Sequence, residues 1–365
     1  MSTIRPLQEK DLPQVISLFE LEMGSGTRNA PPGMEAHFRT LFLDGPWVDP
    51  EIPALVFEGQ DGRIGGVIGS NVRKMKFKGE SIRLAASGPL FVEPQQRTLA
   101  AFLLRRYFSG PQELTMTDRQ SLAAQTLFVK LGGEIAHLQC LRWTHIFKPY
   151  TFKGYHLQYV PRLSGLWPRL RPATEALDTL NAALPHRRSV SAPNLQEEVL
   201  TPNALVTNLE AVTKGLDLYP DYEEGYVAWA LGELAKRTHK GTLTSVLVRD
   251  PKGRVIGWYI YYLNAGGLCE VFQIAAARGK IDDVLDHLFF HARRGGAAAL
   301  RGRVEPDLRE SLRHRNVSFS QQACLIIHSK NPEYLRAVTS GKALMSFLEG
   351  AVFTRETFIP PEPNT

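Results

Sequence analysis

Apolar and polar positions along the first 147 residues switch between strand and helix spacing in a regular order. Ile4–Leu7 alternates like a short strand, and apolar residues between Leu12 and Leu21 recur three or four apart, as on one face of a helix. The pattern then predicts a helix at 34–43, strands at 53–58, 64–74 and 81–92, a helix at 96–107, a strand at 113–117, a helix at 121–131 and a strand at 134–147.

The second half of the chain repeats this order of elements, although its residues differ. It predicts helices at 204–214 and 223–238, strands at 242–248, 255–263 and 268–275, a helix at 281–293, a strand at 298–304, a helix at 307–314, a strand at 317–328, a helix at 332–348 and a strand at 351–358. Between the halves, prolines interrupt every apolar run except one helix at 174–184.

This repeat predicts two α/β (α+β) domains in tandem, at 1–147 and 203–365, joined by a linker at 148–202. Each domain should contain a mixed, mostly antiparallel central sheet with helices around it. The strands Ser81–Val92 and Leu268–Ala275 should occupy matching central positions in the two sheets.

Composition fits two ordinary globular domains, because 43% of the 365 residues are hydrophobic, enough for two cores. The net charge of +6 is more typical of a solvated basic face than of a nucleic-acid surface, although tRNA stays open as a partner. Cys140, Cys269 and Cys324 lie in separate apolar runs, so we expect reduced core cysteines and no metal site. No segment resembles a signal peptide or a membrane span, and the expected location is the cytoplasm.

The chemically most informative stretch is Leu90–Leu104, where a strand stops at Pro94 and a helix follows at once. Successive backbone N–H groups at a helix start, together with the helix dipole, form a site for a phosphate or a pyrophosphate. By itself, the feature favours an ordinary strand-to-helix turn over a phosphate site.

The same stretch resembles the acyl-CoA signature of the GNAT (GCN5-related N-acetyltransferase) superfamily, in which Val-x-Pro ends a strand and Gln/Arg-x-x-Gly-x-Gly/Ala follows. Ile4–Leu7 and Ser121–Gly133 resemble the beginning and the late helix of that family, so the likeness covers about residues 4–145. It implies an N-acyltransferase that moves an acetyl or longer acyl group from acyl-CoA or a carrier thioester to an amine. The residues that would bind acyl-CoA are Val92, Gln95, Arg97, Thr98, Ala100 and Ser121.

Two residues depart from the family pattern. Thr98 stands where glycine is most common, and Phe128 stands where many members have a tyrosine that protonates the departing thiolate. The candidate proton carriers are Ser87 on the central strand and His137, which should share one face of the strand 134–147 with Gln139. A half-buried structural histidine is the commoner interpretation of His137.

The corresponding turn of the second half, Arg278-Gly-Lys280, is followed by Asp282 and Asp283, whose charges would repel a pyrophosphate. We therefore expect this copy to lack an acyl-CoA site. Tyr219–Tyr222 with Trp229 is similar to a region of tandem FemXAB-type transferases. Three functions stay open at this point: an N-acyltransferase, an aminoacyl-tRNA-dependent transferase of the FemXAB type, and a catalytically silent binding module.

Overall fold

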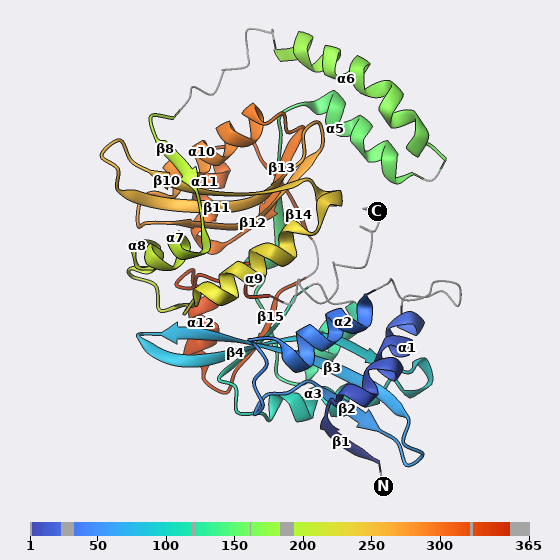
Figure 1. Cartoon of the computed structure of the whole chain (residues 1–365). Helices are drawn as coiled ribbons and strands as arrows, with labels where there is room; N and C mark the ends of the chain where they lie inside the picture. Colours follow the sequence, from blue (N-terminus) through green and yellow to red (C-terminus); the bar gives the residue numbers. More distant parts are fainter. Residues whose placement is uncertain are drawn as a thin grey trace. The chain divides into compact units, whose positions relative to one another are not determined.

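The computed structural model describes residues 2–22, 33–118, 122–160, 162–182, 193–321 and 324–350. They fold into two compact units, each with one mixed sheet and its own helices, so the predicted α/β class is confirmed (Figure 1). Of these described residues, unit 1 comprises those within 2–137, 217–222 and 324–350, and unit 2 comprises those within 138–216 and 223–321. The predicted strand at 351–358 lies outside the described residues.

The sheet of unit 1 has the order β1-β2-β3-β4-β5-β15-β6, with β9 paired to β3. Only β4 and β5 run parallel, and the other neighbouring strands are antiparallel. The strands are β1 (Thr3–Pro6), β2 (Leu55–Glu58), β3 (Ile64–Phe77), β4 (Glu80–Val92), β5 (Leu114–Thr117), β6 (Glu134–Ile135), β9 (Leu218–Pro220) and β15 (Ile326–His328).

The helices of unit 1 bury their apolar stripes as their spacing predicts. In α3, for example, Leu103, Leu104 and Tyr107 are buried, and Phe19 of α1 packs edge-on against Phe91 at 5.5 Å. The helices are η1 (Glu9–Asp11), α1 (Leu12–Glu22), α2 (Met34–Arg39), η2 (Thr40–Asp44), η3 (Pro94–Gln96), α3 (Leu99–Phe108), α4 (Leu122–Lys130) and α12 (Pro332–Thr339).

The sheet of unit 2, read from its β8 edge, has the order β8-β10-β11-β12-β13-β7-β14. Again only one pair, β12 with β13, runs parallel. The strands are β7 (Leu141–Ile146), β8 (Gln196–Val199), β10 (Thr242–Arg249), β11 (Val255–Leu263), β12 (Leu268–Ala276), β13 (Ala299–Arg303) and β14 (Ser318–Gln321).

The main helix of unit 2 is α10, which buries Val284, Leu285 and Leu288 in a core that also holds Trp143 and Leu300. The helices of this unit are η4 (Leu138–Cys140), α5 (Pro149–Tyr155), η5 (His156–Tyr159), η6 (Ser164–Leu166), α6 (Trp167–Ala182), α7 (Pro202–Thr207), α8 (Leu209–Thr213), α9 (Glu224–Ala235), η7 (Thr238–Lys240), α10 (Ile281–Arg294), η8 (Pro306–Leu308) and α11 (Arg309–Arg313).

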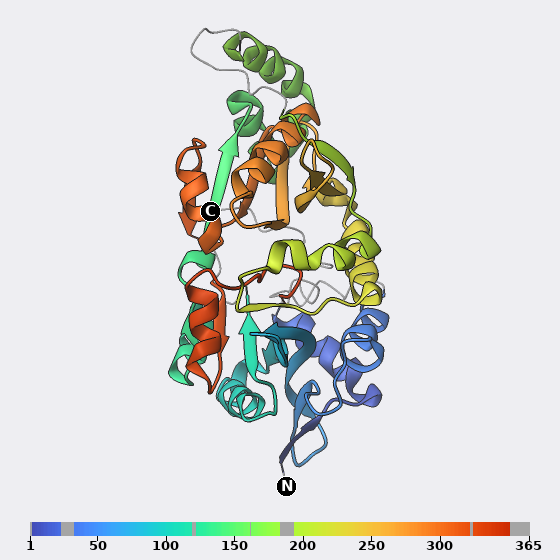
Figure 2. The ribbon, with the colours of Figure 1, turned by 90° about the vertical axis from the view of Figure 1, so that its left-hand side faces the viewer.

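The two sheets match strand by strand, and β4 and β12 are each fourth in their order, so the predicted central positions are confirmed. One strand of each sequence repeat lies in the sheet formed mostly by the other repeat, an arrangement that we call the strand exchange. β7, from the first half of the sequence, lies between β13 and β14 of unit 2, where Figure 2 shows it in green. β15, from the second half, lies between β5 and β6 of unit 1.

The exchange corrects two sequence predictions. The segment 134–147 is not one strand, because β6 stays in unit 1, η4 follows, and β7 joins the other sheet. The segment 317–328 is divided in the same way into β14 and β15. The proposed limits of the two sequence repeats stay 1–147 and 203–365, with the linker at 148–202. The packed units have different limits, because each contains one strand from the other repeat.

One further prediction was wrong in its local structure. The linker helix begins at Trp167 rather than at 174, because α6 takes Pro168 into its first turn and accommodates Pro172 within the helix. The structure also adds a short strand that the sequence pattern did not predict: Tyr219 lies on β9, which pairs with β3 in unit 1.

Candidate functional site

The central strands of unit 1 separate into a fork. The parallel ladder of β4 and β5 joins three residue pairs and ends at Ala86 and Met116, whereas β4 continues to Val92 beside β3. Pro89 cannot donate to a ladder, and Gly88 adopts a φ of 141° that favours glycine. The register with β3 shifts between Ile68 and Ser70, so a bulge bends β4 where it leaves β5.

Ser87, a predicted catalytic residue, lies at this fork and is only 1% exposed. Its hydroxyl donates to the carbonyl of Met116 over 3.4 Å, and Thr117 Oγ1 donates to the carbonyl of Ser87 over 3.1 Å. These two bonds fasten β4 to β5 at the last point where the strands are neighbours.

β4 leads directly into the predicted phosphate turn and the N-terminus of α3. Gln95, Arg97 and Thr98 are exposed there, and Val92 and Ala100 are partly buried. Thr98 is the N-cap of α3 with a helical φ of −63°, and its side chain makes no capping bond. Its backbone carbonyl accepts from the amide of Ala101 over 3.1 Å. A φ in the helical region does not require glycine, so Thr98 fits this turn without backbone strain.

A carboxylate missed by the sequence analysis, Glu93, lies at the start of the turn. It accepts from the Arg63 guanidinium at 2.9 Å and from the Gln96 side-chain amide at 2.7 Å. Since Arg63 neutralises Glu93, the exposed guanidinium of Arg97 gives the turn a formal charge of +1. The sequence shows Glu93 inside the Val-x-Pro run, but the partner thirty residues away comes only from the folded sheet.

Several solved structures are similar to this chain over most of its length, at low sequence identity. A GCN5-related N-acetyltransferase from Kribbella flavida matches with a TM-score of 0.55 and 12% identity, covering 90% of this chain and 72% of that one. One from Anabaena variabilis ATCC 29413 matches with a TM-score of 0.55 and 12% identity, covering 91% and 74%. A protein of unknown function from Enterococcus faecalis V583, named a probable N-acyltransferase, matches with a TM-score of 0.53 and 10% identity, covering 94% and 74%.

The chain has the GNAT fold in two copies. No model of a known protein family matches the sequence, and no curated protein matches it significantly. The expected GNAT resemblance is therefore confirmed at the level of the fold.

Phe128, which the sequence analysis matched to the usual tyrosine, belongs to the core of unit 1. Phe128 on α4 is 2% exposed and packs edge-on against Phe108 at 5.6 Å. Phe108 in turn stacks on His328 of β15 at 3.9 Å. Ser121, predicted to bind acyl-CoA, lies outside the described residues.

His137, the second predicted catalytic residue, is exposed on the turn between β6 and η4. Gln139 is buried, so the two side chains do not share a strand face as expected. Among the described residues, no hydrogen bond joins His137 to Ser87, and the structure does not assemble them into a pair.

The matching turn of the second GNAT-type unit leads into α10, with Lys280 at the N-cap. Its two aspartates are paired: Asp283 with Lys280 at 2.9 Å and Asp282 with Arg315 at 2.7 Å. Burial opposes ionisation of Asp282, but hydrogen bonds from Arg315 and Ser311 outweigh it and hold its pKa below the ordinary value. Lys280 and Arg315 balance the charges of Asp283 and Asp282, so the repulsion of a pyrophosphate is weaker than the two carboxylates alone would give.

Other features bear on a site more weakly. All three cysteines are buried, as predicted for core residues. In the described part of the chain, no group of three or more His, Cys, Asp and Glu side chains could hold a metal ion. Among the described helices, none is long and apolar enough to cross a membrane.

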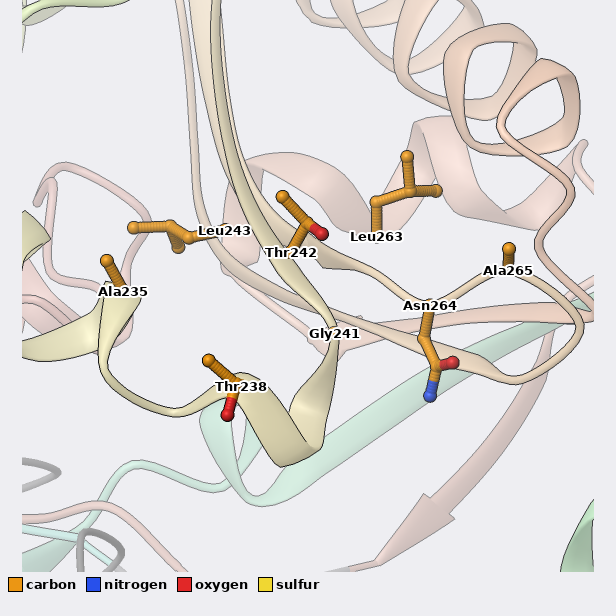
Figure 3. A pocket seen from close by; sticks show the side chains of 8 residues that line it. All are labelled: Ala235, Thr238, Gly241, Thr242, Leu243, Leu263, Asn264 and Ala265. Carbon is orange, nitrogen blue, oxygen red and sulfur yellow. The ribbon is translucent and has the colours of Figure 1, made fainter.

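Unit 2 contains an open cavity of about 520 Å³ at the end of β10 and β11 (Figure 3). It is lined by Ala235, Thr238, Gly241, Thr242, Leu243, Leu263, Asn264 and Ala265. The sequence analysis assigned no ligand to this region.

Proposed function

We propose that unit 1 is an N-acyltransferase that transfers an acyl group from acyl-CoA to an amine. The observation that carries the proposal is the fork between β4 and β5, followed at once by the turn and the N-terminus of α3. The names of the similar GNAT structures, two N-acetyltransferases and a probable N-acyltransferase, agree with this activity.

The pantetheine arm would run along the free edge of β4 beyond Ala86, and the pyrophosphate would lie over the turn. The helix dipole of α3 and the charge of Arg97 favour an anion there, since Arg63 already balances Glu93. The proposed contacts are Val92, Gln95, Arg97, Thr98 and Ala100, with Ser121 proposed from the sequence alone.

The reaction requires little beyond positioning. The amine nitrogen attacks the thioester carbonyl carbon, the C–S bond breaks, and CoA leaves as a thiolate while the nitrogen loses a proton. A backbone N–H on the free edge of β4 would polarise the carbonyl oxygen. Phe128 carries no proton, so the thiolate would take its proton from water.

The two predicted proton carriers receive different roles in this proposal. The Ser87 hydroxyl is buried and bonded to Met116, so we assign it to positioning the fork. His137 is exposed and stays the proposed proton acceptor for the amine.

Thr98→Glu tests the donor site because it adds a negative charge at the N-cap of α3. Repulsion between one charge and a pyrophosphate about 5 Å away costs roughly 1 to 2 kcal/mol in a solvated site, which weakens CoA about five- to thirtyfold. Thr98→Gly should keep or tighten binding, since its removed Cβ lets the phosphate oxygens come closer. Calorimetric titration of CoA and acetyl-CoA measures both effects.

Lys280→Glu is the matched control. It makes a larger charge change at the corresponding N-cap of α10 in unit 2, and we expect CoA affinity to stay the same. Equal affinities in wild type and Thr98→Glu, or a loss caused by Lys280→Glu, would contradict the assignment to unit 1.

The buried Phe128 also favours a second candidate, a binding module without catalysis. Acetyl-CoA that binds but is not consumed when a panel of primary amines is added, measured as released thiol, would select this second candidate.

A further inference from the structure

Large apolar side chains that are exposed gather in one part of unit 2. Thirteen such side chains are exposed among the described residues, and seven of them lie between residues 150 and 180. This segment contains α5 and α6, and we call residues 149–182 the α5–α6 hairpin. Figures 1 and 2 show α5 between α6 and the sheet of unit 2. A concentration of exposed apolar side chains on a folded surface marks a contact with a partner or a membrane.

Four leucines of this set follow one side of α6. Leu166 at the end of η6, together with Leu170, Leu177 and Leu180 of α6, is between 42% and 69% exposed. At about 100° of rotation per residue, the four side chains fall within an arc of about 80°. We call these four residues the leucine stripe.

α6 packs within its own unit through a different face. Trp167 and Asp178 are buried, and they lie roughly 110° around the helix from the centre of the leucine stripe. Any Cβ at Gly154 of α5 would collide with the Trp167 ring, so the two helices approach closely there. Asp178 accepts from two backbone N–H groups at the start of α5, at 3.0 and 2.8 Å. The packing of α6 on α5 therefore leaves the leucine stripe open.

The hairpin is fastened to the rest of unit 2. Asn264 donates from Nδ2 to the Tyr155 hydroxyl at 3.3 Å, and Arg171 donates to the carbonyl of Ala265 at 3.4 Å. Both contacts reach the turn between β11 and β12. An apolar helix face that is already ordered on a folded unit binds a partner without a further cost of ordering.

Two cations lie at the N-terminal end of the leucine stripe. Arg162 and Arg169 are exposed, and neither forms an ion pair with any described residue. The hairpin has only two acidic residues. Glu175 pairs with Arg171 at 2.9 Å, and the buried Asp178 bonds to the backbone of α5. This end of the stripe is therefore both apolar and positively charged.

The size of the surface argues against a second copy of the chain as its partner. A stable dimer buries about 800 Å² and roughly 20 to 30 residues on each side, whereas this patch has seven large apolar residues. Coiled-coil pairing extends over about three or four heptads, whereas α6 has 16 residues, little more than two heptads. A basic and apolar helix surface is typical of a helix that lies in the headgroup region of a bilayer.

We propose that the α5–α6 hairpin binds the surface of an anionic lipid bilayer. The leucine stripe would lie at the boundary between headgroups and acyl chains, and Arg162 and Arg169 would contact lipid phosphates. Val160 and Leu163, which are 42% and 37% exposed just before α6, extend the apolar contact. The proposal does not require acyl transfer or the turn in unit 1.

The test measures how the full chain sediments with two kinds of vesicle, phosphatidylcholine alone and phosphatidylcholine mixed with phosphatidylglycerol. Wild type should bind the mixed vesicles at least tenfold more tightly than phosphatidylcholine alone, and added salt should remove most of this difference.

The leucine stripe is tested by the double variant Leu170→Gln and Leu177→Gln. Complete burial of a leucine changes an equilibrium constant by a factor of about 10 to 150, and both side chains are already about half-buried. Each substitution should therefore weaken binding about three- to tenfold, and the double variant about ten- to a hundredfold. Leu21→Gln is the matched control, because Leu21 is 57% exposed on α1 of unit 1, and it should not change binding.

The charges are tested by the double variant Arg162→Gln and Arg169→Gln. Each basic residue near an anionic surface contributes about fivefold to affinity, so binding to the mixed vesicles should fall about 25-fold. Binding to phosphatidylcholine alone should stay the same. Arg278→Gln is the control, since Arg278 is exposed and precedes α10, whereas Lys148 joins the start of the hairpin to Gly296, which follows α10.

Two further measurements separate this proposal from misfolding and from the acyl-CoA proposal. All variants should keep the Tm of wild type, and Leu180→Gln, at the most exposed position of the stripe, repeats the leucine test if the double variant is unstable. The leucine variants should leave CoA titration unchanged, and Thr98→Glu should leave vesicle binding unchanged, so the two proposals fail separately.

Four results would overturn the inference. They are an absence of binding to the mixed vesicles, equal binding to both kinds of vesicle, unchanged binding of the leucine variants, and an equal loss caused by Leu21→Gln. Light scattering tests the remaining partner. A dimer of the full chain that the leucine variants dissociate, without any vesicle binding, would assign the stripe to a second copy and refute the lipid surface.

Discussion

Trp143 and Ile327 test the strand exchange because each lies in the half of the sequence opposite to most of its unit. Trp143 on β7 is fully buried, stacks on Phe289 at 5.7 Å and donates from Nε1 to the carbonyl of Arg303 at 3.1 Å. Trp143→Ala should destabilise unit 2 by about 3 to 5 kcal/mol for the lost packing. The lost hydrogen bond adds about 1 kcal/mol. A domain is stable by only about 5 to 15 kcal/mol, so the effect should be large.

Ile327→Ala is the reciprocal change. Ile327 on β15 is fully buried in the apolar core of unit 1, and its truncation should destabilise that unit by about 2 to 5 kcal/mol. The milder Trp143→Phe and Ile327→Val keep the comparison possible if either alanine variant fails to fold.

Hydrogen exchange read by mass spectrometry resolves the two sheets. Trp143→Ala should speed exchange in β11, β12 and β13 and spare β3 and β4, and Ile327→Ala should do the reverse. Faster exchange in β3 and β4 on mutation of Trp143 would refute the exchange, as would equal effects of each variant on both sheets.

Two further predictions concern buried polar groups. His287 bonds through Nδ1 to the Tyr259 hydroxyl at 3.0 Å, and its pKa is lowered by burial more than Glu197 raises it, so the unfolded chain binds the proton more tightly. Stability should then fall as the pH drops below the ordinary value of 6.5, and His287→Gln should flatten that part of the Tm-against-pH curve, a result that an unchanged curve would contradict. Glu349 is fully buried and accepts from the Tyr222 hydroxyl and from the amide of Ser346. Tyr222→Phe should therefore cost unit 1 about 1 to 3 kcal/mol in denaturant unfolding, whereas Tyr219→Phe on β9 should cost little.

Local sequence patterns predicted most elements because turn residues separate the long strands, and long helices such as α3 and α10 carry one apolar stripe. The segments 64–74, 81–92 and 255–263 are strands as expected, and α3 and α10 begin within a few residues of the predicted starts. The turn after Pro94 was also found, because Pro94 cannot donate to a ladder and directly follows the last residues of β4.

Hydrophobic periodicity does not determine which strands pair with each other. The alternation of Leu141–Ile146 fits either sheet equally well, and no glycine or proline marks the break at Leu138–Cys140. The same limit applies to the ion pairs of the candidate site and of unit 2. The pairs Arg63–Glu93 and Arg142–Glu270 join residues 30 and 128 positions apart, so no local pattern predicts them.

The exchange also limits how the two repeats can change independently. A chain that stopped at residue 147 would lack β15, so β5 and β6 would each lose a neighbour, while Leu141–Ile146 and its buried Trp143 would have no sheet to join. The second repeat alone would lack β7, and β13 would become an edge that exposes the ring face of Phe289. Each sheet thus depends on one strand from the other repeat.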